Sequence, residues 1–292
     1  MNSRGNLLMG GLIALFLTGD GLGGSREFPH AKSCPQDPQQ AYVPAGEFWM
    51  GSTREEREYA YRLDKEVTRA YGWYEKETRK KVKTASFCID RYPVTNAQYK
   101  AFIDETRHPE PFISPEAYQR QGFLVHPYEK VKEFLWKIQS FPAGREDHPV
   151  VLVNLDDAAS YCAWIGKRIK PRYRLPTEAE WEKAARGTDG RVFPWGNDWN
   201  ADYLNSGERF GATTAVSRLP RGTSPYGLYD MVGNVFEWTA TRWDEKKYVV
   251  KGCSWGDLPG TCRAAMRHGR PPQSKHILIG FRCVSELTSF QP

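Results

Sequence analysis

Residues 226–239, YGLYDMVGNVFEWT, bring together two carboxylates, one asparagine and two glycines among aromatic residues, without a lysine or an arginine. Such a stretch can be a turn between buried segments, a metal loop or the floor of an active site. Calcium takes oxygen ligands, and backbone carbonyls can supply several of them where glycine lets the chain turn sharply. In the alternative interpretation, Asn234 bonds its own backbone in a turn while the aromatics pack inward. The spacing is not that of an EF-hand, so the residues alone leave both interpretations open.

A second candidate is a small basic cluster formed by Arg267, His268 and Arg270. These side chains could hold an anionic or carboxylate-bearing ligand, or they could be exposed turn residues. Aromatic residues could line a groove beside such a site, although tryptophans more often belong to the core. The tryptophans concerned are Trp195, Trp238 and Trp255.

The cysteines are a third group of residues that could carry chemistry. The chain has six cysteines, and an even number favours disulfides in an oxidising compartment. No CxxC pair occurs and the six histidines lack zinc spacing, so we expect no structural zinc site. The sequence also lacks HExxH and P-loop motifs, and no other catalytic machinery stands out in it.

The N-terminal residues predict where the protein acts. A basic start is followed by the apolar run LLMGGLIALFLTG and small residues, which predicts a secretory signal peptide over residues 1–24. Residues 25–40 are polar and proline-rich and are expected to form a flexible lead-in to one domain over residues 41–288. We therefore expect an exported, periplasmic protein without membrane association after signal cleavage. The net charge of +6 is mild and no nucleic-acid motif occurs, so no nucleic-acid partner is expected.

Capping residues predict three helices that would position these candidates. Residues 95–106 begin with the capping box TNAQ. Asn154 can cap the second helix, which we expect to end at Gly166. The third helix runs over residues 177–187, from the capping box TEAE to a glycine.

Strands and loops are expected between these helices. Residues 42–52 and the first half of 87–106 have strand patterns, and a third short strand is expected directly before Asn154. The insertion 54–83 mixes charges of both signs and is interpreted as a solvated helix followed by a charged loop. Residues 107–147 are expected to form irregular loops over the core. Beyond the third helix the chain is expected to be turn-rich with short strands.

In this order, several segments resemble the formylglycine-generating enzyme family, also called the sulfatase-modifying-factor domain. The matching residues are VPAGEFWMGS, FCIDRYPVTNAQYKAFI, HPVVLVNLDDAASYCAWIGKR, RLPTEAEWEKAARG, VFPWGNDW, YGLYDMVGNVFEWT, VKGCSW and IGFRC. They extend over residues 42–284. The resemblance implies a single mixed α/β, loop-rich domain with a variant of the C-type lectin fold. This agrees with the short strands, capped helices and turns that the residues predict.

The resemblance also implies structural calcium. One ion of the family would be held at positions that correspond to Asp230, the carbonyls of Gly233 and Val235, and Glu237, and a second site would start at Asn205.

A disulfide shared by the family would join Cys162 and Cys283. For the other four cysteines, structural disulfides are expected: Cys253 and Cys262 could pair with each other or with Cys34 and Cys88.

The family's copper site is incomplete in this sequence. Formylglycine-generating enzymes bind Cu(I) through two cysteines shortly after a Gly-Gly-Ser-aromatic motif, and soft thiolates suit that metal. Here Cys253 replaces a glycine of the motif, and a count without gaps places Asp257 and Cys262 at the two ligand positions. A thiolate beside a carboxylate is a poor Cu(I) site, so we expect no copper, and these three residues remain the catalytic candidates.

The resemblance also indicates a substrate groove, lined here by Trp255, Arg267, His268 and Arg270. The function expected is an exported oxidoreductase, or a maturation or accessory factor, that acts on a peptide-like substrate or partner protein without the two-cysteine copper site. The alternative is a non-catalytic, calcium-stabilised binding protein on a C-type-lectin-like scaffold. A formylglycine generator with unusual ligands is the third hypothesis, and it fails if Cys253 and Cys262 form structural disulfides.

Overall fold

The computed structural model describes Cys34 and residues 39–122, 125–168 and 172–287. The predicted signal peptide, residues 1–24, lies outside the described residues. The end of the predicted lead-in belongs to the domain, because the first strand begins at Gln40 and Cys34 forms a disulfide with Cys88. No helix of the described residues is long and apolar enough to cross a membrane.

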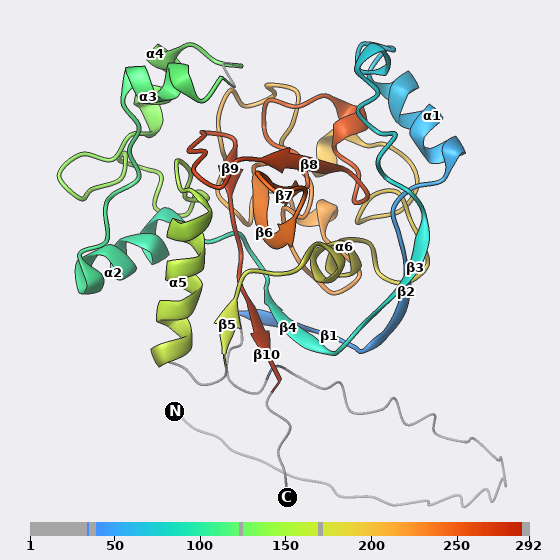
Figure 1. The fold of residues 1–292 in the computed structure, drawn as a ribbon, viewed down its shortest axis with the longest axis horizontal. Coiled ribbons are helices and arrows are strands. Elements are labelled where there is room, and N and C mark those ends of the chain that lie inside the picture. Colours follow the sequence, from blue (N-terminus) through green and yellow to red (C-terminus); the bar gives the residue numbers. More distant parts are fainter. Residues whose placement is uncertain (1–33, 35–38, 123–124, 169–171, 288–292) are drawn as a thin grey trace, which may run out of the picture. The chain divides into compact units, whose positions relative to one another are not determined.

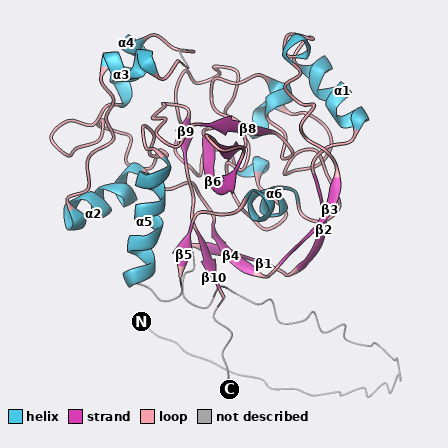
Figure 2. Cartoon of the chain, in the orientation of Figure 1, coloured by secondary structure: helices cyan, strands magenta, loops and turns pink. Residues whose placement is uncertain are grey.

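Three small sheets form the framework of the fold (Figure 1 and Figure 2). The first sheet has the order β1-β4-β10-β5, and all its neighbours are antiparallel. Its strands come from distant parts of the chain: β1 (Gln40–Val43), β4 (Phe87–Asp90), β10 (Val284–Glu286) and β5 (Tyr173–Arg174).

The second sheet is a pair formed by β2 (Gly46–Met50) and β3 (Lys80–Thr84). Strand β3 lies where the sequence predicted a charged loop. Its alternation places Val82 opposite the buried Phe48, whereas Lys81 and Lys83 lie on the other, exposed face. Charged residues are compatible with this strand, because one of its two faces is exposed to solvent.

The third sheet has the order β8-β7-β6-β9. Its strands are β8 (Arg267–Arg270), β7 (Tyr248–Lys251), β6 (Phe236–Arg242) and β9 (Ile279–Gly280). Helix α6 (Glu178–Arg186) contacts both the second and the third sheet, so its buried residues join them (Figure 1).

The three predicted helices are present. Capping boxes begin α2 (Asn96–Thr106) at Thr95 and α6 at Thr177. The side chain of Asn154 accepts a hydrogen bond from the Asp157 amide at the start of α5 (Leu155–Arg168). The predicted end at Gly166 is wrong, because α5 continues to Arg168.

Two other local predictions are wrong. Residues 107–147 contain α3 (Pro115–Arg120), α4 (Tyr128–Val131) and the short 3-10 helix η2 (Lys132–Phe134). The segment directly before Asn154 is not a strand: its amides bond to separate segments, Val150 to the carbonyl of Val94 and Leu152 to that of His276.

The insertion contains α1 (Arg54–Leu63) and η1 (Arg69–Tyr71) before it enters β3. The remaining 3-10 helices are η3 (Ala201–Tyr203), η4 (Pro220–Gly222) and η5 (Pro259–Thr261).

Aromatic residues fill the core. Trp238 is fully buried and its Nε1 donates to the carbonyl of Val153. Trp255 is also fully buried, stacked on Phe134. These two tryptophans are core residues, and the prediction that Trp255 lines an open groove is wrong.

Candidate functional site

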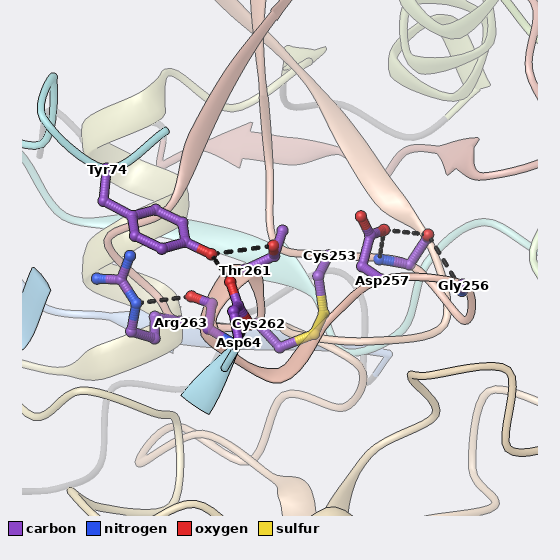
Figure 3. Close-up of a disulfide and its surroundings, with 10 residues drawn as sticks. Asp64, Tyr74, Cys253, Gly256, Asp257, Thr261, Cys262 and Arg263 are labelled. Carbon is purple, nitrogen blue, oxygen red and sulfur yellow. Dashed lines mark hydrogen bonds between the residues drawn. A yellow bond between two sulfur atoms is a disulfide. The ribbon is translucent and has the colours of Figure 1, made fainter. Parts of the chain in front are cut away.

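The two cysteines of the predicted copper region form a disulfide with each other (Figure 3). Cys253 and Cys262 have Cα atoms 4.9 Å apart, and both side chains are fully buried. Their sulfurs are therefore bonded to each other and do not form a pair of thiolates. The residues present do not fit a Cu(I) dithiolate site.

Asp257 closes the turn inside this loop. Its Oδ2 accepts hydrogen bonds from the Ser254 amide, at 2.9 Å, and from the Ser254 hydroxyl (Figure 3). Burial raises the pKa of Asp257, and the hydrogen bonds from Ser254 and the charge of Arg270 act against that rise. The carboxyl group at the expected first copper position is thus a local acceptor that shapes residues 254–257.

The insertion packs directly on the same loop, a contact that the sequence did not predict. Asp64 Oδ1 accepts a hydrogen bond of 2.6 Å from the Gly260 amide, and the Tyr74 hydroxyl donates to Asp64 Oδ2 (Figure 3). The Arg263 guanidinium donates two hydrogen bonds, of 2.8 and 2.9 Å, to the carboxylate of Glu77, and both side chains are buried. The insertion is therefore not simply solvated, since some of its charges are buried partners of the disulfide loop.

The predicted basic cluster is distributed over separate environments. Arg267 donates two hydrogen bonds to Glu178, at 2.7 and 2.9 Å. Burial, together with the charges of Arg270 and Lys247, lowers the pKa of His268 to about 3, so this imidazole is neutral. Burial also lowers the pKa of Arg270 to about 10. Of the three, Arg267 is committed to a carboxylate and His268 carries no charge, so the cluster does not act as one anion site.

An open groove lies next to this cluster. It has a volume of about 670 Å³ and is lined by residues of α3, by the segment before it and by the loop 271–275. We call it the α3 groove and define it by Phe112, Ile113, Ala117, Arg120, Pro271 and Lys275. The sequence did not predict it, because its two sides are distant in the chain. The one sequence feature that could have pointed to this groove was Pro271, which directly follows the basic cluster.

The turn that contains Asp230 and Glu237 offers a partial fit for calcium. Burial raises the pKa of Asp230 to about 7, although a hydrogen bond from Asn234 opposes the rise. The buried oxygens Asn205 Oδ1 and Thr214 Oγ1 have no hydrogen-bond partner among the described residues. Both residues also contact the Asn234 side chain, so these unsatisfied oxygens surround the turn. A hard cation is the kind of group that such oxygens accept.

Glu237 fits this site less well. Arg282 donates to both of its oxygens, at 2.7 and 2.8 Å, and Trp181 Nε1 donates a third hydrogen bond of 2.7 Å. Its charge is therefore already balanced inside the protein. Asn234 also differs from the prediction, because its side chain bonds Thr214 and Asp230 rather than its own backbone.

The remaining disulfide joins Cys162 and Cys283, as the family resemblance implies. It connects α5 to the segment before β10 and lies in the main core cluster.

A family model and named relatives match most of this chain. The family model described as sulfatase-modifying factor enzyme 1-like domain matches residues 25–287. The inactive C-alpha-formylglycine-generating enzyme 2 of Mus musculus is 32% identical, over 87% of this chain and 90% of that protein. The formylglycine-generating enzyme of Bos taurus is 29% identical, over 90% of this chain and 77% of that protein.

A solved structure shows the same arrangement. The structure of PvdO from Pseudomonas aeruginosa has a TM-score of 0.66 and 26% identity, and the match covers 87% of this chain and 96% of that one. The chain therefore belongs to the formylglycine-generating enzyme family and has a mixed α/β fold.

Proposed function

We propose that this protein is an exported maturation or accessory factor that binds a peptide-like segment of a partner protein without copper-dependent formylglycine formation. The observation that carries the proposal is the buried Cys253–Cys262 disulfide, which uses both sulfurs of the region where the family holds copper. Relatives named inactive C-alpha-formylglycine-generating enzyme 2, 32% and 35% identical, support it.

The α3 groove is the proposed binding site for that segment. Its volume lies in the range of ligand sites, and several of its walls are apolar. Relatives named formylglycine-generating enzyme support a peptide-like occupant.

A non-catalytic binding protein is the second candidate function. It is favoured because the predicted reactive groups bond to other residues of the protein. Asp257 accepts a hydrogen bond from Ser254, Arg267 donates to Glu178, and the two cysteines form a disulfide.

We also propose a structural calcium ion at the 230–237 turn. The Asp230 carboxylate, the Asn205 side-chain oxygen and the carbonyls of Gly233 and Val235 would hold it, and Glu237 would act through its ion pair with Arg282. Bound calcium would supply positive charge to a buried turn around which two side-chain oxygens have no partner among the described residues.

Export to the periplasm is proposed from the predicted signal peptide, and the three disulfides support it, because such bonds persist in oxidising compartments. Fractionation of cells followed by alkylation of free thiols tests this: recovery in the cytoplasmic fraction with reactive cysteines would contradict it.

The central experiment incubates the purified, oxidised protein with a cysteine-containing sulfatase peptide, with and without Cu(I). Mass spectrometry of the peptide should show no conversion of cysteine to the aldehyde under either condition. A family enzyme with the complete copper pair is the positive control. Copper-dependent aldehyde formation by this protein would refute the proposal.

A further inference from the structure

We infer that the α3 groove selects an acidic and apolar peptide segment. The inference rests on the proposed function, since it names the chemistry of the partner segment that this groove would bind.

The groove offers apolar contact surface at its floor and rim. Ile113 is buried beneath it, whereas Phe112 at its rim is 48% exposed. Ala117 and Pro271 continue this surface on the two sides. A large exposed aromatic beside a concave surface gains most from a partner side chain that covers it. One apolar side chain of an extended peptide would therefore lie between Phe112 and Pro271.

The charges of the groove have one sign. Arg120 and Lys275 line it, and no aspartate or glutamate is among the described residues that do. Lys275 Nζ is 2.9 Å from Asp157, which offsets part of its charge. Arg120 is attracted to the exposed Glu116, one helical turn earlier, and solvent weakens that attraction. A carboxylate next to the apolar anchor would thus be attracted to Arg120, and a basic side chain would be repelled.

Hydrogen bonds hold the two sides of the groove in place. The Gln121 side chain donates to the carbonyl of Lys275 and accepts from its amide, at 3.0 and 3.2 Å. The Tyr128 hydroxyl donates to the carbonyl of Ile113, and that of Tyr118 to the carbonyl of His126. A groove that is already formed binds without the cost of ordering its walls.

The test measures binding by fluorescence anisotropy with the full-length mature protein. The probe is a short fluorescein-labelled peptide of alternating Asp and Leu, and its counterpart carries Lys in place of every Asp. We expect the acidic peptide to bind about tenfold or more tightly than the basic one, with an affinity that falls as salt is added.

Two groove variants and one control make the result specific. Arg120→Glu should weaken binding of the acidic peptide about tenfold and strengthen that of the basic one, whereas Phe112→Ala should weaken both. Arg221→Glu makes the same charge change at an exposed arginine of η4, outside the groove lining, and should leave both affinities unchanged. Circular dichroism and melting curves confirm that the variants are folded.

The outcomes distinguish the charge preference of the α3 groove from its proposed role in peptide binding. If both peptides bind equally, and Phe112→Ala weakens both while Arg120→Glu changes neither, the groove binds peptides but the inference about charge is refuted. If neither peptide binds, both the inference and the proposed role of the groove are refuted. An equal loss of affinity in Arg120→Glu and Arg221→Glu would place the effect in the net charge of the molecule, and would also refute the inference.

Discussion

Asp230 and Glu237 lie in the same turn, yet their carboxylates have different surroundings. Glu237 is neutralised by Arg282 inside the core. Asp230 instead bonds Asn234, which also contacts two residues whose buried side-chain oxygens have no partner among the described residues. The two residues should therefore respond differently to mutation and to calcium.

Asp230→Ala should abolish any rise in melting temperature caused by calcium, while it changes the stability measured in EGTA only modestly. Glu237→Ala leaves a buried guanidinium without its partner and should lower the free energy of unfolding by about 3–5 kcal/mol even in EGTA. Differential scanning fluorimetry in calcium and in EGTA measures both. A wild-type melting temperature that is the same in both buffers would contradict the calcium proposal.

Asp157, at the start of α5, gives a test of pH dependence. Burial by itself would raise its pKa, but hydrogen bonds from His108 and the Asn154 amide and the charge of Lys275 outweigh it, so the pKa is lowered. A carboxyl group with a lowered pKa stabilises the folded state fully above its unfolded value of about 3.9. That contribution is lost as the pH falls through the lower, folded-state value.

The stability difference between the wild type and Asp157→Asn should therefore be largest near neutral pH and shrink below about pH 4. Urea unfolding at a series of pH values measures it, with the exposed Asp156→Asn as the control. A difference that grows on acidification would show that the sign of the pKa shift is wrong.

At the scale of elements, the insertion is held by buried charges in addition to a small apolar cluster of Ala60, Tyr61 and Tyr74 with Met266. Glu77 pairs with Arg263 in the disulfide loop, and Asp64 receives the Gly260 amide. Gly260 is needed there, because a Cβ at that position would lie 2.3 Å from the carbonyl oxygen of Ala60.

Glu77→Gln should lower the free energy of unfolding by about 3 kcal/mol or more, because it leaves Arg263 as an uncompensated buried charge. Glu75→Gln, two residues earlier with a 59% exposed side chain, should change it by no more than about 0.5 kcal/mol. Chemical denaturation compares the two variants. Equal effects would mean that the insertion does not depend on this ion pair.

How well an element could be predicted depends on the distance of its partners in the sequence. The helices after Thr95 and Thr177 were predictable because a capping box is complete within four neighbouring residues. Strand β3 was not, since its charged residues form a strand only against β2, across the whole insertion. The α3 groove was missed for the same reason: Gln121 and Lys275, which join its sides, are 154 positions apart.

The candidate site was also only partly predictable, because its contacts join residues that are distant in the sequence. The sequence identified Cys253, Asp257 and Cys262 as residues of interest, but their use depends on contacts that the spacing does not encode. The family resemblance placed Trp255 and His268 in a substrate groove, but Trp255 is fully buried and neither residue lines the α3 groove.

At the scale of the whole molecule, the disulfides constrain very different lengths of chain. Cys162 and Cys283 are separated by 121 positions, whereas Cys253 and Cys262 are separated by 9. A crosslink that closes a longer loop removes more entropy from the unfolded chain.

Replacing Cys162 and Cys283 together by alanine should therefore cost about 5 kcal/mol, and the same change at Cys253 and Cys262 about 2.5 kcal/mol. Denaturation of both double variants under oxidising conditions measures the difference. If the short-loop pair proved the more costly, contacts of the 253–262 loop rather than chain entropy would control the stability.

The order of the first sheet has a consequence for the synthesis of the chain. Strand β10 lies between β4 and β5, so this sheet cannot close until residues 284–286 have been made. A nascent chain that has reached only the middle of the domain still lacks the strand that joins its two halves. Such a chain cannot complete the first sheet while its C-terminal residues are still to be translated. Closure of the sheet and formation of the Cys162–Cys283 disulfide, directly before β10, therefore belong to the last stage of synthesis or follow it.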